Sequence, residues 1–218
     1  MPPSPPSPVA SQRIAEVLAQ RILAGELAPG ARIKQDELAD ELNTSRIPVR
    51  EALRILESRG LVTLRANSGA WVATMSLHDL ALTYQIREQI EPLLLRESLP
   101  HLAESDLDRM RGTQAEIEAT SDVEEFMVLD REFHWSSYAG AQAPQLCLMV
   151  ERLWDTTQHY RRAFARMAGT ERAWIINAEH RLLIEAAAAR DLDNASTVLT
   201  MHIRRTRLEL SRHPELMS

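Results

Sequence analysis

Four side chains able to bind a metal ion lie in three separate stretches of the second half of the sequence. Asp130 and His134 stand four residues apart in DREFHW, His180 lies in NAEHRLLIEAA, and His202 lies in TMHIRR. Residues at i and i+4 project from one face of a helix, which places Asp130 and His134 together. Three imidazoles and one carboxylate suit zinc, nickel, iron or manganese. Spacing alone leaves an alternative, in which Asp130 and His134 form only a surface pair.

Three arginines recur at helical spacing in the first half of the sequence. Arg46, Arg50 and Arg54 stand at i, i+4 and i+8, and Thr44 and Ser45 precede them. Hydroxyls and free N–H groups at the start of a helix can donate hydrogen bonds to phosphates. An arginine can also donate two hydrogen bonds to O6 and N7 of guanine in the major groove of DNA. The pattern therefore predicts a helix that contacts DNA.

A solvated helix face would show the same spacing, with Arg50 and Arg54 paired to Glu51 or Glu57. The elements expected around the arginines favour the DNA-binding interpretation. In order they are a helix that begins at Ser11 and ends at Gly25, a short helix from about Gln35, the arginine helix ending at Gly60, and a β-hairpin of residues 61–64 and 70–74. This order predicts a winged helix-turn-helix over residues 11–75, after a disordered Pro/Ser tail at residues 1–10.

The rest of the sequence predicts helices and no strand. Apolar periodicity between Pro and Gly breaks gives approximate spans of 77–99, 104–119, 122–139, 143–168, 171–189 and 191–211. Pro92 lies inside the first span, where it would kink the helix or stand near a break. About six helices in residues 76–214 predict an antiparallel bundle, and so a mostly α protein of two domains.

Composition limits the class of protein. The 218 residues are 44% hydrophobic and 26% charged, as in an ordinary globular protein. The net charge is −6, yet residues 46–65 hold five arginines against two glutamates. This local positive charge fits a compact phosphate-binding module. No long apolar run and no signal peptide are found, and the single cysteine, Cys147, fits a reducing compartment. We therefore expect a cytoplasmic protein with no membrane partner.

Residues 45–61, SRIPVREALRILESRGL, and the wing sequence NSGAWV resemble the DNA-binding domain of the GntR family of bacterial transcription regulators. The resemblance covers residues 11–75 and implies a homodimer that binds double-stranded operator DNA with twofold symmetry. It implies DNA contacts from the residues singled out above and from the wing tip near Gly69. The sequence departs from the family at Asp36, where many relatives carry arginine, and at Ile47, where a hydroxyl is frequent.

Residues 77–212 resemble the FCD ligand-binding domain, the helical partner of this DNA-binding domain in the FadR subfamily. The family's metal ligands correspond to Asp130, His134, His180 and His202 without departure. The resemblance thus implies a divalent metal cofactor, zinc first, with nickel, iron or manganese as alternatives. A bundle of about six helices is typical of the shorter, VanR-like branch.

In related FCD domains, water or an effector carboxylate completes the metal's coordination, so the resemblance implies a small organic acid effector. Arg87 matches an arginine that lies near this site and could clamp a carboxylate. Asn177, one helical turn before His180, is a second candidate. The alternative for Arg87 is a helix salt bridge to Glu91.

The leading hypothesis is a transcription regulator, not an enzyme, whose operator affinity responds to a metal and an effector. The alternative is a metal-dependent hydrolase, because an Asp/His₃ site with an open position can activate water. No further residue stands out as its general base.

Overall fold

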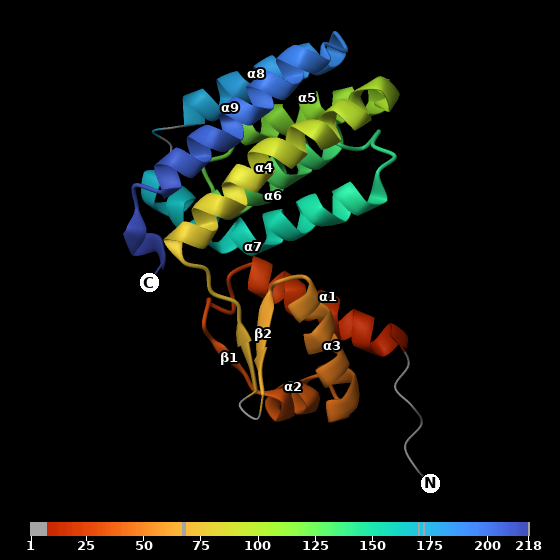
Figure 1. The fold of residues 1–218 in the computed structure, drawn as a ribbon, viewed down its shortest axis with the longest axis vertical. Coiled ribbons are helices and arrows are strands. Elements are labelled where there is room, and N and C mark those ends of the chain that lie inside the picture. Colours follow the sequence, from red (N-terminus) through yellow and green to blue (C-terminus); the bar gives the residue numbers. More distant parts are fainter. Residues whose placement is uncertain (1–7, 67–68, 170, 172, 218) are drawn as a thin grey trace. The chain divides into compact units, whose positions relative to one another are not determined.

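The computed structural model describes residues 8–66, 69–169, 171 and 173–217 (Figure 1). The chain divides into two compact units, one running up to Met75 and including Trp154–His159, the other comprising the rest of the chain from Ser76. The first seven residues of the predicted tail at residues 1–10 lie outside the described residues. Within the described residues, none of the helices is both long and apolar enough to cross a membrane.

The N-terminal unit is a winged helix-turn-helix, as predicted. Its elements are α1 (Pro8–Leu23), β1 (Arg32–Ile33), α2 (Gln35–Glu41), α3 (Arg46–Ser58), β2 (Val62–Arg65) and β3 (Gly69–Val72). The three strands form an antiparallel sheet in the order β1-β3-β2. The apolar faces of α1 and α3 meet in a core that includes Leu18, Val49, Leu53, Leu56 and Val72. This core fixes α3 with its opposite face exposed.

Two details of the N-terminal unit differ from the sequence predictions. The first helix begins at Pro8, three residues before the predicted N-cap Ser11, which is buried within the helix. The sheet has a third strand, Arg32–Ile33, that the sequence did not predict. Two residues are too short for an alternating pattern to be recognised, and the strand exists through its pairing with Trp71 and Ala70 of β3.

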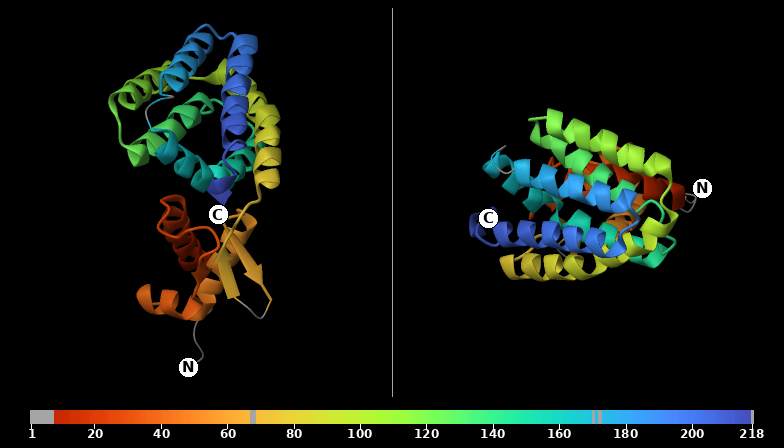
Figure 2. Two further views of the ribbon diagram at one scale, coloured as in Figure 1. Left: turned by 90° about the vertical axis from the view of Figure 1, so that its left-hand side faces the viewer. Right: turned by 90° about the horizontal axis from the view of Figure 1, so that it is seen from above.

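The second unit is a helical bundle with no strand in its described residues, as predicted. The helices are α4 (Leu77–Ser98), α5 (Glu104–Ala119), α6 (Val123–Ser137), α7 (Pro144–Ala168), α8 (Ala173–Ala188) and α9 (Leu192–Leu210), with short 3₁₀ turns η1 (Leu99–His101) and η2 (Pro214–Met217). Helix α9 packs against α4 and α8, and α5 packs against α6 and α8 (Figure 2). Pro92 lies within α4, which continues beyond it to Ser98.

Helix starts and one glycine set the positions of the helices that carry the candidate metal ligands. The Asp122 side chain accepts a hydrogen bond from Glu125 N at the start of α6, and Asp191 accepts one from Asn194 N at the start of α9. After α6, Gly140 N donates to Ser98 Oγ at 3.0 Å. A Cβ at position 140 would lie 2.7 Å from Leu102 N, so only glycine fits this approach.

Candidate metal centre and nucleic-acid interface

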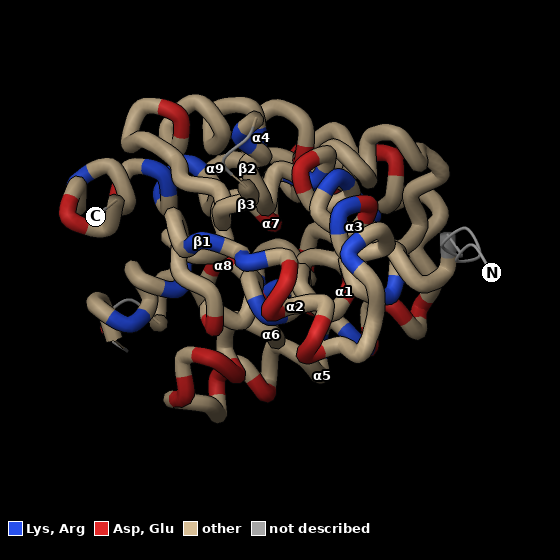
Figure 3. The backbone as a smooth tube through the Cα atoms, turned by 90° about the horizontal axis from the view of Figure 1, so that it is seen from below, with Lys and Arg blue, Asp and Glu red and all other residues tan. Residues whose placement is uncertain are grey.

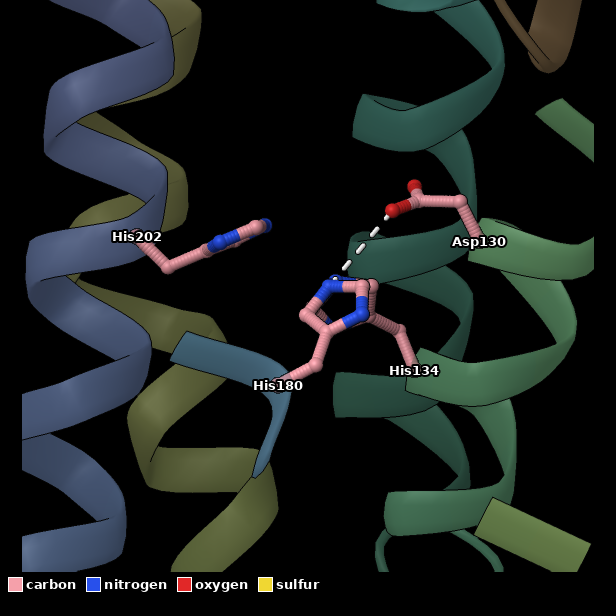
Figure 4. Close-up of side chains that lie close together, drawn as sticks. All are labelled: Asp130, His134, His180 and His202. Atoms are coloured by element: carbon pink, nitrogen blue, oxygen red, sulfur yellow. Dashed lines mark ion pairs between the residues drawn. The ribbon is translucent and has the colours of Figure 1, made fainter. Parts of the chain in front are cut away.

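The four predicted metal ligands converge in the helical unit. Asp130 and His134 project from α6, His180 from α8 and His202 from α9, and their side chains point toward one another (Figure 4). One potential ligand atom of each residue lies within 4.8 Å of the others. The three imidazole centroids are 5.1 or 5.2 Å apart. Asp130 and His134 are buried, so the surface-pair alternative is wrong.

Two of the imidazoles are oriented by hydrogen bonds from their other ring nitrogen. His180 Nδ1 donates to Gln114 Oε1 at 2.7 Å, and His202 Nδ1 donates to Glu179 Oε2 at 2.8 Å. These bonds leave the lone pair of each Nε2 for a ligand, and His180 Nε2 lies 3.6 Å from Asp130 Oδ1. Metal-binding histidines in proteins are usually held by such bonds, so Gln114 and Glu179 act as supports for the group.

The electrostatics of the group favour neutral imidazoles beside one carboxylate. Burial is the main cause that lowers the pKa of His180 to about 3 and the pKa of His202 to about 4. Burial and the neighbouring cations also lower the pKa of His134 well below its usual value. Burial alone would raise the pKa of Asp130, but its ion pair with Arg161 and the nearby imidazoles outweigh that effect and lower it.

The residues fit a divalent metal ion. Metal ligation needs deprotonated imidazoles and carboxylates, which are the forms that these pKa shifts favour near neutral pH. Ligand atoms about 2.0–2.2 Å from a common ion stand no more than about 4.4 Å apart, so a group spanning 4.8 Å needs only a small contraction. The described structure therefore contains a buried Asp/His group that could bind a metal.

The two candidate effector residues already have partners within the protein. Arg87 forms a buried ion pair with Glu91, the alternative that the sequence left open, and Glu91 also accepts a hydrogen bond from Tyr138 Oη at 2.9 Å. Asn177 Oδ1 accepts from Gln114 Nε2 at 3.1 Å, which links it to the support of His180. An effector that uses Arg87 must share this guanidinium with Glu91.

In the N-terminal unit, the predicted arginine stripe lines one open groove. Arg46, Arg50 and Arg54 of α3 line it, together with Gly69 at the wing. The sequence did not single out three further cations in its lining, which are Arg32, Lys34 and Arg65. Figure 3 shows basic positions along α3 and at β1, with acidic positions on α2. Such a groove is a surface on which DNA phosphates can bind.

Two of the groove arginines form ion pairs with carboxylates of the same unit. Arg46 Nε lies 2.6 Å from Asp36 Oδ1, and Arg54 Nη1 donates to Glu51 Oε1 at 2.9 Å, as the solvated-face alternative foresaw for Arg54. Ser45 occupies the N-cap position of α3, and its side chain makes no capping hydrogen bond to the helix. Half-buried Thr44 precedes it. The two ion pairs of Arg46 and Arg54 are exposed, so a phosphate can replace the carboxylate of each pair at a small cost in free energy.

Each of the two units matches a family of known proteins. Residues 10–72 match the family model described as bacterial regulatory proteins, gntR family, and residues 82–205 match the model of the FCD domain. The chain belongs to the gntR family of bacterial regulatory proteins and carries an FCD domain.

Named relatives of this GntR-family chain are transcription regulators. It is 26% identical over 179 residues to the Nta operon transcriptional regulator of Aminobacter aminovorans, covering 81% of this chain and 83% of that protein. It is also 26% identical over 204 residues to the transcriptional repressor RspR of Escherichia coli, covering 92% and 88%. The solved structure of E. coli McbR/YncC has the same fold, with a TM-score of 0.82, 22% identity and coverage of 94% and 98%.

Sequence reasoning on this GntR-family member missed the residues that support its candidate metal ligands. Gln114 lies on α5, 66 residues before His180, and no spacing signal connects the two. Glu179 directly precedes His180 in AEHR, yet it contacts His202 on the next helix. Arg161 comes from α7 to reach Asp130. Only the packing of five helices, α5 to α9, brings these side chains together.

Proposed function

We propose that this protein regulates transcription as a metal-dependent sensor of a small carboxylate. The metal, zinc first, is held by Asp130, His134, His180 and His202, and operator DNA is held by the groove along α3. The observation that carries the proposal is the convergence of these four side chains from three helices in a buried group. The six-helix bundle supports a place in the VanR-like branch.

The bound metal would supply a Lewis-acid position for a carboxylate oxygen of the effector. The protein's own residues do the remaining work. Gln114 orients the imidazole of His180, and Glu179 orients that of His202. Arg161 forms an ion pair with Oδ2 of Asp130. Arg87 is the proposed effector clamp because it is a buried cation of the helical unit at the position where related FCD domains carry an arginine near the metal. Asn177 adds an amide beside Gln114.

The groove of the N-terminal unit is proposed to bind the major groove of DNA through α3. Exposed Arg50 stands in the middle of the stripe, where it can reach a base edge. Thr44 and Ser45 at the start of the helix would contact phosphates. Replacement of Arg50 by alanine should weaken operator binding by about 1–3 kcal/mol, with a smaller loss on random DNA.

A homodimer is part of the proposal, because a twofold operator needs two recognition helices. An exposed apolar stripe on α4 supports contact with a second copy: Leu82, Ile86 and Leu93 are 43%, 50% and 50% exposed. Sedimentation of the free protein and of the DNA complex tests this point. A monomer under both conditions would remove it.

The His134→Ala variant tests the coupling of metal, effector and DNA. An operator is first selected by the protein from random duplexes, and its affinity is then measured against a panel of small mono-, di- and hydroxycarboxylates. The parent should respond to at least one acid, whereas His134→Ala should bind operator equally well with no response. By linkage, operator and acid must change each other's affinity by the same factor. A normal response from His134→Ala would leave the metal without a sensing role.

The metal-dependent hydrolase remains the weaker candidate. The named relatives are transcription regulators, and the DNA-binding unit would have no part in hydrolysis. Turnover of generic esters or phosphoesters by the metal-loaded parent, lost in His134→Ala, would support it instead.

A further inference from the structure

The exposed face of the N-terminal sheet carries a group of side chains that the arginine stripe does not explain. Trp71 of β3 stands in register with Arg32 of β1 on one side and with Thr63 of β2 on the other. The guanidinium carbon of Arg65 lies 4.7 Å from the centre of the Trp71 ring system, and that of Arg32 lies 5.8 Å from it. Both distances fall within the range of cation–π attraction. We call Arg32, Arg65 and Trp71 the wing cluster.

The two arginines of the wing cluster line the same groove as the arginine helix. Arg32, Arg65 and the neighbouring Gly69 share its lining with Arg46 and Arg50, whereas Trp71 contacts the two arginines without lining the groove itself. Gly69 has φ +119°, which L side chains rarely adopt, and a Cβ there would meet Arg32 Nε and Trp71 at 3.8 Å. The positive φ is the reason that glycine suits this position, which lies directly beside Arg32 and Trp71.

Ion pairing differs among the cations of the groove, and within the described residues neither Arg50 nor Arg65 has an acidic partner. On the helix side, Arg46 is paired with Asp36 and Lys34 with Glu37. The contact of Arg65 is with the indole ring. A guanidinium that stacks on an aromatic ring keeps its in-plane N–H donors available for an oxygen ligand. The cluster thus offers positive charge without a competing carboxylate on Arg65.

We propose that Trp71 is a positioning residue that holds Arg32 and Arg65 against the sugar–phosphate backbone of DNA bound in this groove. The inference rests on the proposed docking of α3 on DNA. The ring limits the conformations of two flexible side chains before DNA arrives, so less entropy is lost when phosphates bind. Phosphate contacts set the orientation of a protein on the duplex and do not read sequence. The wing cluster should therefore strengthen binding to all DNA sequences alike.

The test compares variants of the full chain on a random-sequence duplex and on an operator selected from random DNA, by fluorescence anisotropy. Trp71→Leu should weaken binding to both duplexes by about two- to fivefold, the size of an exposed cation–π contribution. Trp71→Phe restores an aromatic ring and should bind like the parent. Thr63→Ala, an exposed change on the same face of the sheet, is the matched control and should also bind like the parent.

The salt dependence of binding separates positioning from a structural role. Arg32→Ala and Arg65→Ala should each reduce the slope of log affinity against log salt by about 0.9, as expected for one lost phosphate contact. Arg65→Ala leaves the indole in place, so this readout does not depend on how Trp71→Leu folds.

Unchanged slopes in both arginine variants would overturn the inference. A loss confined to the selected operator would also overturn it, because the cluster would then read sequence. A parent that binds neither duplex would contradict the proposed function itself. If the parent binds DNA and all the wing variants bind like it, the inference about the wing cluster is wrong and the proposed function stands.

Discussion

The candidate sites of the two units differ in how far their titratable side chains are exposed to solvent. In the groove of the N-terminal unit, Arg46 and Asp36 form an ion pair whose side chains are 70% and 61% exposed. In the helical unit, Asp130, His134 and His180 are no more than 2% exposed. Exposed pairs contribute little and exchange partners easily, whereas buried charges must be compensated where they stand. The first arrangement suits a surface that binds and releases phosphates, and the second suits a fixed ligand set.

Acidification should have the largest effect on stability, and it should act on the helical unit. The pKa of His180 is about 3 and that of His202 about 4 in the fold, against 6.5 for the unperturbed group. The unfolded chain therefore binds more protons below pH 6.5, and the stability of the metal-free helical unit should fall by several kcal/mol as pH falls from about 6.5 to 4. Chemical denaturation at a series of pH values measures this.

The His202→Gln variant serves as control and should flatten that pH dependence, because one of the buried imidazoles is removed. Equal pH profiles for the parent and His202→Gln would contradict the assigned role of burial.

A close backbone approach in the helical unit gives the next largest effect. Gly140→Ala places a methyl group 2.7 Å from Leu102 N and should cost about 1–3 kcal/mol or more of stability. Gly112→Ala is the matched control, since it adds a methyl group to an exposed position of α5 with no atom within 4 Å. Helix propensity should make Gly112→Ala more stable by about 0.5–1 kcal/mol. Similar unfolding temperatures for the two variants would contradict the packing described after α6.

Removal of a buried support should weaken the metal site without touching a ligand. Gln114→Ala deletes the acceptor of His180 Nδ1 and should lower metal affinity by about 10–100-fold in calorimetric titration with zinc. Gln114→Glu keeps an acceptor oxygen and should retain most of the affinity. Arg181→Ala changes the exposed residue next to His180 and should leave zinc binding unchanged. An unaffected Gln114→Ala would show that His180 needs no support from α5.

The exposed ion pair on the DNA groove should give the smallest effect. Asp36→Asn frees Arg46 and should strengthen binding to duplex DNA by up to about 1 kcal/mol. Stability should change by less than about 0.5 kcal/mol. Glu104→Gln disrupts an exposed pair with Arg111 in the helical unit and should leave DNA affinity unaltered. Weaker DNA binding by Asp36→Asn would mean that Asp36 holds Arg46 in its binding position.

The same contrast explains what the sequence could predict. Period and breaker residues located the six bundle helices, and the Asp130–His134 spacing placed two of the four candidate ligands on one helix face, because both signals are local along the chain. The sequence did not predict strand Arg32–Ile33, because two residues carry no pattern and form a strand only by pairing with β3. Gln114, Glu179 and Arg161 escaped because their roles depend on which helices pack together. Arg87 shows a limit of another kind, since spacing allowed both a clamp and a pair with Glu91, and the structure contains the pair.

Metal content is the most direct test of the central claim, that the buried group of the helical unit is a metal site. The full chain is loaded with zinc, desalted and measured by elemental mass spectrometry, beside His134→Ala and the matched control His78→Ala, whose histidine is exposed. We predict one zinc per chain in the parent and in His78→Ala, and zinc near background in His134→Ala. Zinc at background in the parent, or equal zinc in the parent and His134→Ala, would contradict the claim.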